Sequence, residues 1–301
     1  MAGIALLPTF LQGVEFAGEL VFYDGAPAPA DLERAGFFVP EYMGPISTVE
    51  VLVDLPVLEV VQLLTAGFDY VLPYLPAGAK LCNAAGVHDA STAELAIGLM
   101  LSALRGLDVA ARNMVSGTWQ HETRSSLADR AVLVLGAGGV GQAIRARLEP
   151  FETTVTMIGR TARTGVYAVS DLESLLPNAD VVVIAVPLDV TTDGLVDLQF
   201  LQRMKAGALL VNVARGRVVV TDALIAQLHA GHISAALDVS DPEPLPPDHP
   251  LWSCPNLLIS PHVGGDTSAF APRARSLVMH QLARWASGQE LRNVIPTPQA
   301  Q

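Results

Sequence analysis

The sequence predicts an α/β protein with two doubly wound parallel-sheet domains. Short apolar runs rich in Val, Leu and Ile recur along the chain, and helix-like or polar segments separate them. Apolar runs of this length are typical of strands buried on both faces, as in a parallel sheet. The chain has 301 residues, half of them apolar, and is therefore long enough to bury two cores.

The predicted strands are most regular from about residue 131. There the chain reads "AVLVLG", "TTVTMIG", "ADVVVIAV", "ALLVNVA", "SAALDV" and "NLLIS", with helix-like segments between the runs. This alternation predicts one large parallel sheet. The first hundred residues repeat the pattern less clearly, and "IALLP", "VEVLVDL", "VQLLTAG" and "AKLCN" predict strands of a smaller α/β domain.

Two helix-like segments connect these domains. The segment "STAELAIGLMLSALRGLDVAARNM" predicts one long helix that opens with a capping box of Ser91 and Glu94. The segment "AFAPRARSLVMHQLARWASG" follows the last strand and can return the chain to the first domain. We therefore expect a substrate domain of residues 1–95 plus 271–301, into which a cofactor domain of residues 96–270 is inserted.

Charge and composition exclude several classes of partner. The net charge is −12, and residues 1–60 hold nine acidic side chains but only one basic side chain, Arg34. An acidic surface repels phosphate groups, which disfavours nucleic-acid binding. It also repels a small anionic substrate, so any anion site must be formed by local positive groups. The apolar runs are too short or too interrupted to span a bilayer, which predicts a cytoplasmic protein with no membrane partner. Cys82 and Cys254 show no C-x-x-C pairing, so we expect neither a metal site nor a disulfide.

A glycine loop indicates a dinucleotide site. Gly136, Gly138 and Gly141 have G-x-G-x-x-G spacing, directly after a predicted strand and at the start of a predicted helix. In this pattern the glycines allow a tight turn, a close approach of backbone to a pyrophosphate, and close helix–strand packing. The larger domain is therefore predicted to be a Rossmann domain.

Arginines stand at the position that discriminates between NAD and NADP. About 20 residues after such a loop, an NAD site usually carries a carboxylate for the ribose hydroxyls. Here that position is Arg160, followed by Thr161 and Arg163, and no acidic residue lies between Glu152 and Asp171. A guanidinium can bind and neutralise a 2′-phosphate. The cofactor is therefore predicted to be NADP(H) in preference, with NAD(H) as the open alternative.

Chemically useful side chains follow three later strands. Arg215 follows "LLVNVA", and His262 follows "NLLIS". Asp238 lies at the end of "SAALDV", and Glu243 follows that stretch. Open α/β sheets bind ligands at the carboxyl ends of their strands. These residues offer an anion anchor, carboxylates and a titratable imidazole at one edge of the sheet.

In this order, the motifs resemble the D-isomer-specific 2-hydroxyacid dehydrogenase family, which includes glyoxylate and hydroxypyruvate reductases. The resemblance runs from "LLTAGFDYV" to "SPHVGG", about two thirds of the chain, and includes "NAAGVHDASTAELAIGL". It implies a Rossmann cofactor domain inserted in a smaller flavodoxin-like substrate domain. It also implies a homodimer formed through the helix from about residue 91.

The resemblance implies a catalytic triad of Arg215, Glu243 and His262. Arg215 is expected to bind the carboxylate and carbonyl of a small 2-oxoacid, with backbone N–H groups of Ala66 and Gly67 on the carboxylate. Glu243 is expected to support His262, the general acid in reduction and the base in the reverse oxidation of the 2-hydroxyacid.

The cofactor site is expected to include residues from several loops, with Asp238 facing the nicotinamide amide and ribose. The further residues predicted there are Gly139, Val140, Val186, Pro187, Thr192, Val213, Ala214 and Gly264. The chain departs from the family pattern at three positions: Ser240 replaces a common aromatic residue, Asp189 a hydroxyl residue and Val220 an acidic residue.

Other functions stay open at this point. The same fold serves a corepressor-like protein that senses the cofactor, and such a scaffold is expected to carry extensions or a peptide-binding surface. This sequence starts almost at its first predicted strand and ends soon after the predicted return helix, which favours the enzyme. Phosphoglycerate dehydrogenase is a further alternative, disfavoured because no regulatory domain follows residue 290. The leading prediction is reduction of glyoxylate, hydroxypyruvate or a similar small oxoacid.

Overall fold

The computed structural model describes residues 3–296 and divides the chain into two compact units. The first unit holds the residues up to His88 and those from Ser268 onward, and the second holds Asp89–Thr267. The boundary expected at 95/96 lies inside a helix that begins at Asp89, whereas the structural division lies at the start of that helix. We describe the two units separately.

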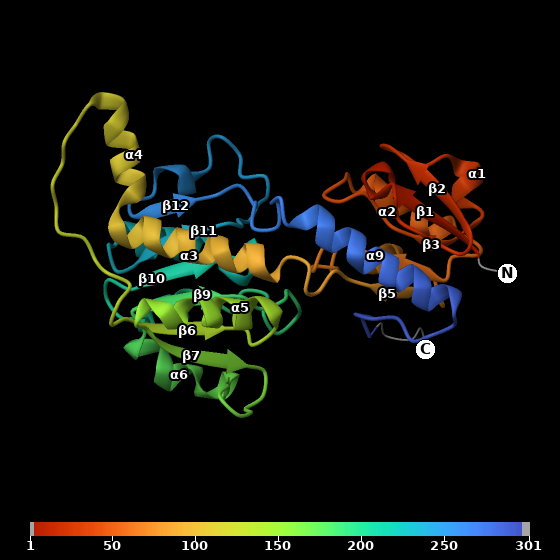
Figure 1. The fold of residues 1–301 in the computed structure, drawn as a ribbon. Coiled ribbons are helices and arrows are strands. Elements are labelled where there is room, and N and C mark those ends of the chain that lie inside the picture. Colours follow the sequence, from red (N-terminus) through yellow and green to blue (C-terminus); the bar gives the residue numbers. More distant parts are fainter. Residues whose placement is uncertain (1–2, 297–301) are drawn as a thin grey trace. The chain divides into compact units, whose positions relative to one another are not determined.

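The first unit is a parallel five-stranded sheet in the order β2-β1-β3-β4-β5. This is the flavodoxin-like strand order, and Figure 1 shows α9, from the C-terminal part of the chain, beside strands from the N-terminal part. The bounds are β1 Ile4–Pro8, β2 Glu19–Tyr23, β3 Ala35–Phe38, β4 Val60–Gln62, β5 Lys80–Cys82, α1 Pro29–Leu32, α2 Ser47–Glu50 and α9 Phe270–Ala286, with 3-10 turns at Thr9–Leu11, Val51–Asp54 and Leu72–Tyr74.

Helices cover both faces of this sheet. Ala274, Val278 and Leu282 of α9 repeat at helical spacing and pack against one face, in a cluster with Leu7 and Phe37. The other face packs against α1 and α2. The buried Gln281 of α9 also donates from Nε2 to Gln62 Oε1 of β4, at 2.7 Å.

The second unit is a parallel sheet in the order β12-β11-β10-β9-β6-β7-β8. Counted from β6, the order is that of a Rossmann fold, with the reversal at β6 and β9. The bounds are β6 Ala131–Leu135, β7 Thr154–Gly159, β8 Tyr167–Ala168, β9 Val181–Ile184, β10 Leu209–Asn212, β11 Ser234–Leu237, β12 Leu257–Ile259, α3 Asp89–Arg105, α4 Leu107–Ser116, α5 Gly139–Leu148, α6 Leu172–Leu175, α7 Leu198–Arg203 and α8 Thr221–His229, with 3-10 turns at Glu149–Phe151, Val169–Asp171, Leu176–Asn178, Gly216–Val218 and Pro250–Ser253.

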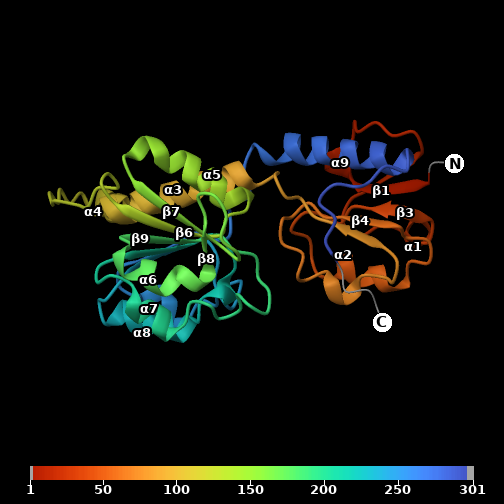
Figure 2. The ribbon, with the colours of Figure 1, turned by 90° about the horizontal axis from the view of Figure 1, so that it is seen from below.

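Alternate residues of these strands pack into two separate cores. Val132 and Val134 of β6 contact the layer that contains α3 and α5, whereas Leu133 and Leu135 contact the layer that contains α6, α7 and α8. Figure 2 shows the two helical layers on opposite faces of the sheet. Burial on both faces explains why the strands read as nearly continuous apolar runs.

Three sequence predictions about elements were wrong. "VEVLVDL" does not form a strand: residues 47–54 form α2 and a 3-10 turn, and Val49 and Leu52 are buried at helical spacing. The long helix is interrupted by Gly106, whose φ of 64° ends α3 before α4 begins. The predicted capping box is absent, because α3 begins at Asp89 and Ser91 bonds instead to the Thr267 hydroxyl.

Candidate active site

The glycine loop joins β6 to α5 at the carboxyl end of β6. Gly136 has a φ of 117°, and a Cβ there would lie 2.2 Å from the Ala185 carbonyl oxygen. A Cβ at Gly141 would lie 1.8 Å from the Gly136 carbonyl oxygen. Both positions require glycine, because the turn and the first helical turn pack directly against backbone.

Gly138 is different, because the space beside it is open. It immediately precedes α5, and an added Cβ would meet no heavy atom within 4 Å. The first amide groups of a helix have no partner within the helix and favour an anion. An open approach to this helix start fits the pyrophosphate of a dinucleotide. At Gly139, a Cβ would lie 1.9 Å from Asp89 Oδ2, a contact that sequence reasoning missed.

The two predicted arginines lie in the loop after β7, both exposed. Arg160 Nη2 lies 2.7 Å from Asp189 Oδ2 in an ion pair. Arg163 Nη2 donates to the Ala137 carbonyl oxygen of the glycine loop at 2.8 Å. Both arginines therefore lie at the carboxyl end of β7, next to the glycine loop, and Arg160 already has an acidic partner. Their role in cofactor binding stays a prediction.

The other predicted cofactor residues lie in loops at the same edge of the sheet. Thr192 closes the loop after β9, because its hydroxyl donates to the Pro187 carbonyl oxygen at 2.7 Å and accepts from the Asp189 amide at 2.8 Å. The remaining predicted residues occupy the start of α5 and the ends of β7, β9 and β10: Val140, Thr161, Val186, Val213 and Ala214.

Arg215 follows β10 in a tight turn. The Asn212 side chain folds this turn, accepting from the Ala214 amide at 3.0 Å and donating to the Arg215 carbonyl oxygen at 2.9 Å. A Cβ at Gly216 would lie 1.9 Å from the Ser240 carbonyl oxygen, so the segment after β11 packs against this turn. Sequence reasoning assigned no role to Asn212 or Gly216, although an Asn in an apolar strand was a visible signal.

His262 and Glu243 are brought together. The Nδ1 atom of His262 and Oε1 of Glu243 form a short hydrogen-bonded contact, and both side chains are partly exposed. The hydrogen bond to Glu243 raises the pKa of His262, and the charges of Glu243 and Asp238 act in the same direction. Burial and the charge of Arg215 oppose this shift. The net result favours the imidazolium form.

Asp238 holds the loop that carries His262. Its buried carboxylate accepts from Ser260 Oγ at 2.6 Å, and from the amides of Val263 at 3.0 Å and Gly264 at 2.9 Å. His262 has a φ of 52°, in the left-handed region that a residue other than glycine seldom occupies. The carboxylate therefore supports an unusual backbone conformation. The predicted contact of Asp238 with the nicotinamide stays a prediction.

Ala66 and Gly67 belong to the first unit, in the loop after β4. Their carbonyl oxygens accept hydrogen bonds, from Asn83 Nδ2 to Ala66 and from Thr65 Oγ1 to Gly67, each at 2.7 Å. The loop is therefore oriented by the chain itself. The predicted role of its amides in substrate binding stays a prediction.

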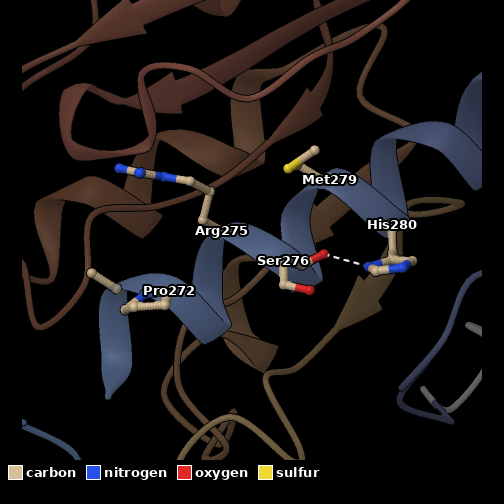
Figure 3. A pocket seen from close by; sticks show the side chains of 6 residues that line it. Pro272, Arg275, Ser276, Met279 and His280 are labelled. Atoms are coloured by element: carbon tan, nitrogen blue, oxygen red, sulfur yellow. Dashed lines mark hydrogen bonds between the residues drawn. The ribbon is translucent and has the colours of Figure 1, made fainter. Parts of the chain in front are cut away.

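Outside this sheet edge, the described residues form a further hollow that is a candidate site. A hollow on one side of α9 is lined by Pro272, Arg275, Ser276, Met279 and His280 (Figure 3), and it contains none of the predicted site residues. Within residues 3–296, no cluster of His, Cys, Asp and Glu side chains could hold a metal ion. In the same part of the chain, every helix is too short or too polar to cross a membrane.

Comparison with known proteins identifies relatives that share most of this chain. Residues 97–264 match the family model for the D-isomer specific 2-hydroxyacid dehydrogenase, NAD binding domain. A glyoxylate reductase of Thermofilum pendens is 32% identical over 255 residues, which cover 80% of this chain and 75% of the relative.

Solved structures extend the similarity to nearly the full length. A D-isomer specific 2-hydroxyacid dehydrogenase family protein from Aeromonas salmonicida superposes with a TM-score of 0.87 at 26% identity, covering 99% of this chain and 100% of that chain. A D-isomer specific 2-hydroxyacid dehydrogenase from Xanthobacter autotrophicus, solved with NADPH and MES, gives 0.83 at 26% identity and covers 99% of each chain. The second unit is a Rossmann fold, and most of it matches the NAD-binding domain of this family. The chain therefore belongs to the D-isomer-specific 2-hydroxyacid dehydrogenase family of NAD(P)-dependent oxidoreductases.

Proposed function

We propose that this protein reduces a small 2-oxoacid of the glyoxylate or hydroxypyruvate type to the D-2-hydroxyacid, with NADP(H) preferred over NAD(H). The observation that carries the proposal is the contact between His262 Nδ1 and Glu243 Oε1 at the sheet edge that also holds Arg215. The glyoxylate reductase activity named for the Thermofilum pendens relative supports the choice of substrate class.

The cofactor preference rests on Arg160 and Arg163. Two guanidinium groups next to a glycine loop favour a phosphate on the adenosine ribose, whereas an acidic residue at the first of these positions would repel it. The NADPH complex of the Xanthobacter autotrophicus relative supports this assignment. The bound nicotinamide supplies or accepts the hydride.

Arg215 binds the substrate in this proposal. Its guanidinium offers two donors to a carboxylate, which orients the adjacent carbonyl carbon and polarises the carbonyl oxygen. The turn formed by Asn212 limits the positions that the Arg215 backbone can take. A cationic group here also offsets the net negative charge of the chain, which would otherwise repel an anionic substrate.

His262 moves the proton. Glu243 occupies Nδ1, so proton transfer to the carbonyl oxygen uses Nε2. The raised pKa favours the imidazolium, which is the form of the ring that can act as the acid in reduction. In the reverse direction the neutral ring accepts the proton of the hydroxyl group. Glu243 is a positioning residue, because it acts through the ring.

The test combines a substrate panel with one variant and one control. We expect the purified protein to oxidise NADPH faster than NADH with glyoxylate or hydroxypyruvate, measured by nicotinamide absorbance. His262→Ala is expected to lower kcat by roughly a hundredfold or more while cofactor binding is retained. His280→Ala, which removes an exposed histidine of α9, is the matched control and should leave kcat unchanged.

Three outcomes would contradict parts of the proposal. Retained turnover in His262→Ala would remove the acid assignment, and a preference for NADH would remove the role of the arginines. Tight cofactor binding without turnover on any oxoacid would favour a cofactor-sensing interaction protein. The homodimer and the cytoplasmic location stay predictions.

A further inference from the structure

The ion pair between Arg160 and Asp189 connects two loops on either side of the glycine loop. Arg160 follows β7, and Asp189 lies in the loop after β9. These strands are the two neighbours of β6 in the sheet, as Figure 1 shows. The guanidinium predicted to select the cofactor is therefore paired with a carboxylate, with Nη2 and Oδ2 2.7 Å apart.

Asp189 is the fixed member of this pair. Its Oδ1 accepts from the Thr191 amide at 2.8 Å and from the Thr191 hydroxyl at 2.6 Å. These bonds, together with the charge of Arg160, lower the pKa of Asp189, so it is ionised at neutral pH. The Asp189 side chain is 33% exposed, whereas that of Arg160 is 74% exposed. Arg160 is the partner that can move toward a ligand.

Arg163 provides an internal contrast. It donates to the neutral carbonyl oxygen of Ala137, so a phosphate that binds Arg163 replaces a contact with a neutral group. A phosphate that binds Arg160 must instead compete with an anion for the guanidinium. The two arginines thus differ in what a 2′-phosphate must displace.

We propose that Asp189 is a specificity-determining residue that limits the preference for NADP(H), because its carboxylate competes with the 2′-phosphate for Arg160. This inference rests on the proposed cofactor preference. If Arg160 contacts both the Asp189 carboxylate and the 2′-phosphate, these two anions lie close together and repel each other. If Arg160 contacts the phosphate alone, its ion pair with Asp189 must break. NAD(H) carries no 2′-phosphate and avoids both costs. Asp189 therefore narrows the difference in affinity between the two cofactors.

Asp189→Asn tests this, because an asparagine keeps an oxygen for Thr191 and removes the charge that attracts Arg160. Dissociation constants for NADP⁺, NAD⁺ and 2′,5′-ADP would be measured by isothermal titration calorimetry with the whole chain. We expect roughly three- to tenfold tighter binding of NADP⁺ and 2′,5′-ADP, with NAD⁺ changed less than about twofold. The gain should shrink as salt concentration rises.

Asp193→Asn is the matched control. Asp193 lies in the same loop and carries the same charge, but its ion-pair partner is Arg217. An equal gain in Asp193→Asn would mean that net charge alone is responsible, which would overturn the proposal. Unchanged or weaker NADP⁺ binding in Asp189→Asn would also overturn it. Asp189→Ser, which should change affinity in the same direction, guards against a local defect of the asparagine variant.

Arg160→Ala separates this inference from the proposed function. If Asp189 acts through Arg160, the gain must disappear in the Arg160→Ala, Asp189→Asn double variant. If Arg160→Ala by itself leaves NADP⁺ affinity unchanged, the proposed cofactor preference fails. If Arg160→Ala weakens NADP⁺ binding but Asp189→Asn does not strengthen it, the present inference alone fails. None of these measurements requires turnover.

Discussion

Three side chains determine the state of His262. Asp238 accepts hydrogen bonds from the backbone amides of the two residues after His262. Glu243 accepts a hydrogen bond from the His262 ring. Arg215 lies close enough for its charge to lower the pKa of the imidazole, opposite to the effect of Glu243. An anion bound to Arg215 would offset the positive charge of the guanidinium. The pKa of His262 would therefore rise when the anion binds.

The pKa of His262 leads to a prediction for Glu243→Gln. Reduction requires the protonated ring, so the rate is full below the pKa of His262 and falls as pH rises through it. Glu243 raises that pKa. In Glu243→Gln the pKa drops, and the decrease in kcat/KM for reduction should begin at lower pH, as measured by pH-rate profiles.

The reverse reaction supplies the control for this prediction. Oxidation of the 2-hydroxyacid needs the neutral ring, so its rate should rise at lower pH in Glu243→Gln than in the wild type. A variant that lowers both rates equally at every pH would show that Glu243 acts only by supporting the fold.

At the scale of elements, parallel strands bring the site together. Because all strand pairs of the second unit are parallel, the loops after β6, β7, β9, β10, β11 and β12 lie at one edge. The glycine loop, the arginines, Arg215, Glu243 and His262 come from these loops. Their positions after successive parallel strands were thus sufficient to place them at the same edge of the sheet.

The glycine loop provides a prediction that separates folding from binding. An added Cβ at Gly141 would lie 1.8 Å from backbone, whereas at Gly138 it would meet nothing within 4 Å. We expect Gly141→Ala to lose about 3 kcal/mol of unfolding free energy or more. Gly138→Ala should unfold at the wild-type temperature but bind NADP⁺ roughly tenfold more weakly, because its methyl group fills the open approach to α5.

Calorimetry and thermal unfolding of both variants check this pair. Each variant serves as the control for the other, since the substitution is the same and only the surroundings differ. Normal cofactor affinity in Gly138→Ala would mean that the pyrophosphate does not approach this residue.

Element errors in the sequence analysis have a common origin. "VEVLVDL" is a short run rich in Val and Leu, as a strand often is, yet Val49 and Leu52 are buried on one side of a helical turn. β3 was missed, because four residues with a glycine give little periodicity although all four are buried. For short segments, packing against the rest of the unit outweighs local preference.

At the scale of the molecule, the second unit begins and ends at neighbouring points. The hydroxyl groups of Ser91 and Thr267 lie 2.8 Å apart, and these residues stand near the start and at the end of the unit. A unit whose ends are close can be inserted into another chain without distortion. This explains how the first unit is made from both ends of the sequence.

This geometry predicts that a fragment of residues 89–267 folds alone. It retains both cores of the second unit and the glycine loop. We expect cooperative thermal unfolding and an affinity for NADP⁺ within roughly threefold of the whole chain. Turnover should be absent, because Ala66 and Gly67, predicted to bind substrate, are missing. Failure of the fragment to unfold cooperatively would show that the second unit depends on the first.

The sequence by itself determined the fold class, the glycine loop and the identity of the residues that could do chemistry. These follow from signals that are local in the chain, such as apolar runs, glycine spacing and polar residues after strands. The tertiary structure decided which side chains are partners. That Asp189 pairs with Arg160, that Asp238 supports the His262 loop and that Gly216 faces the Ser240 carbonyl depend on contacts between distant segments, and no local pattern encodes such contacts.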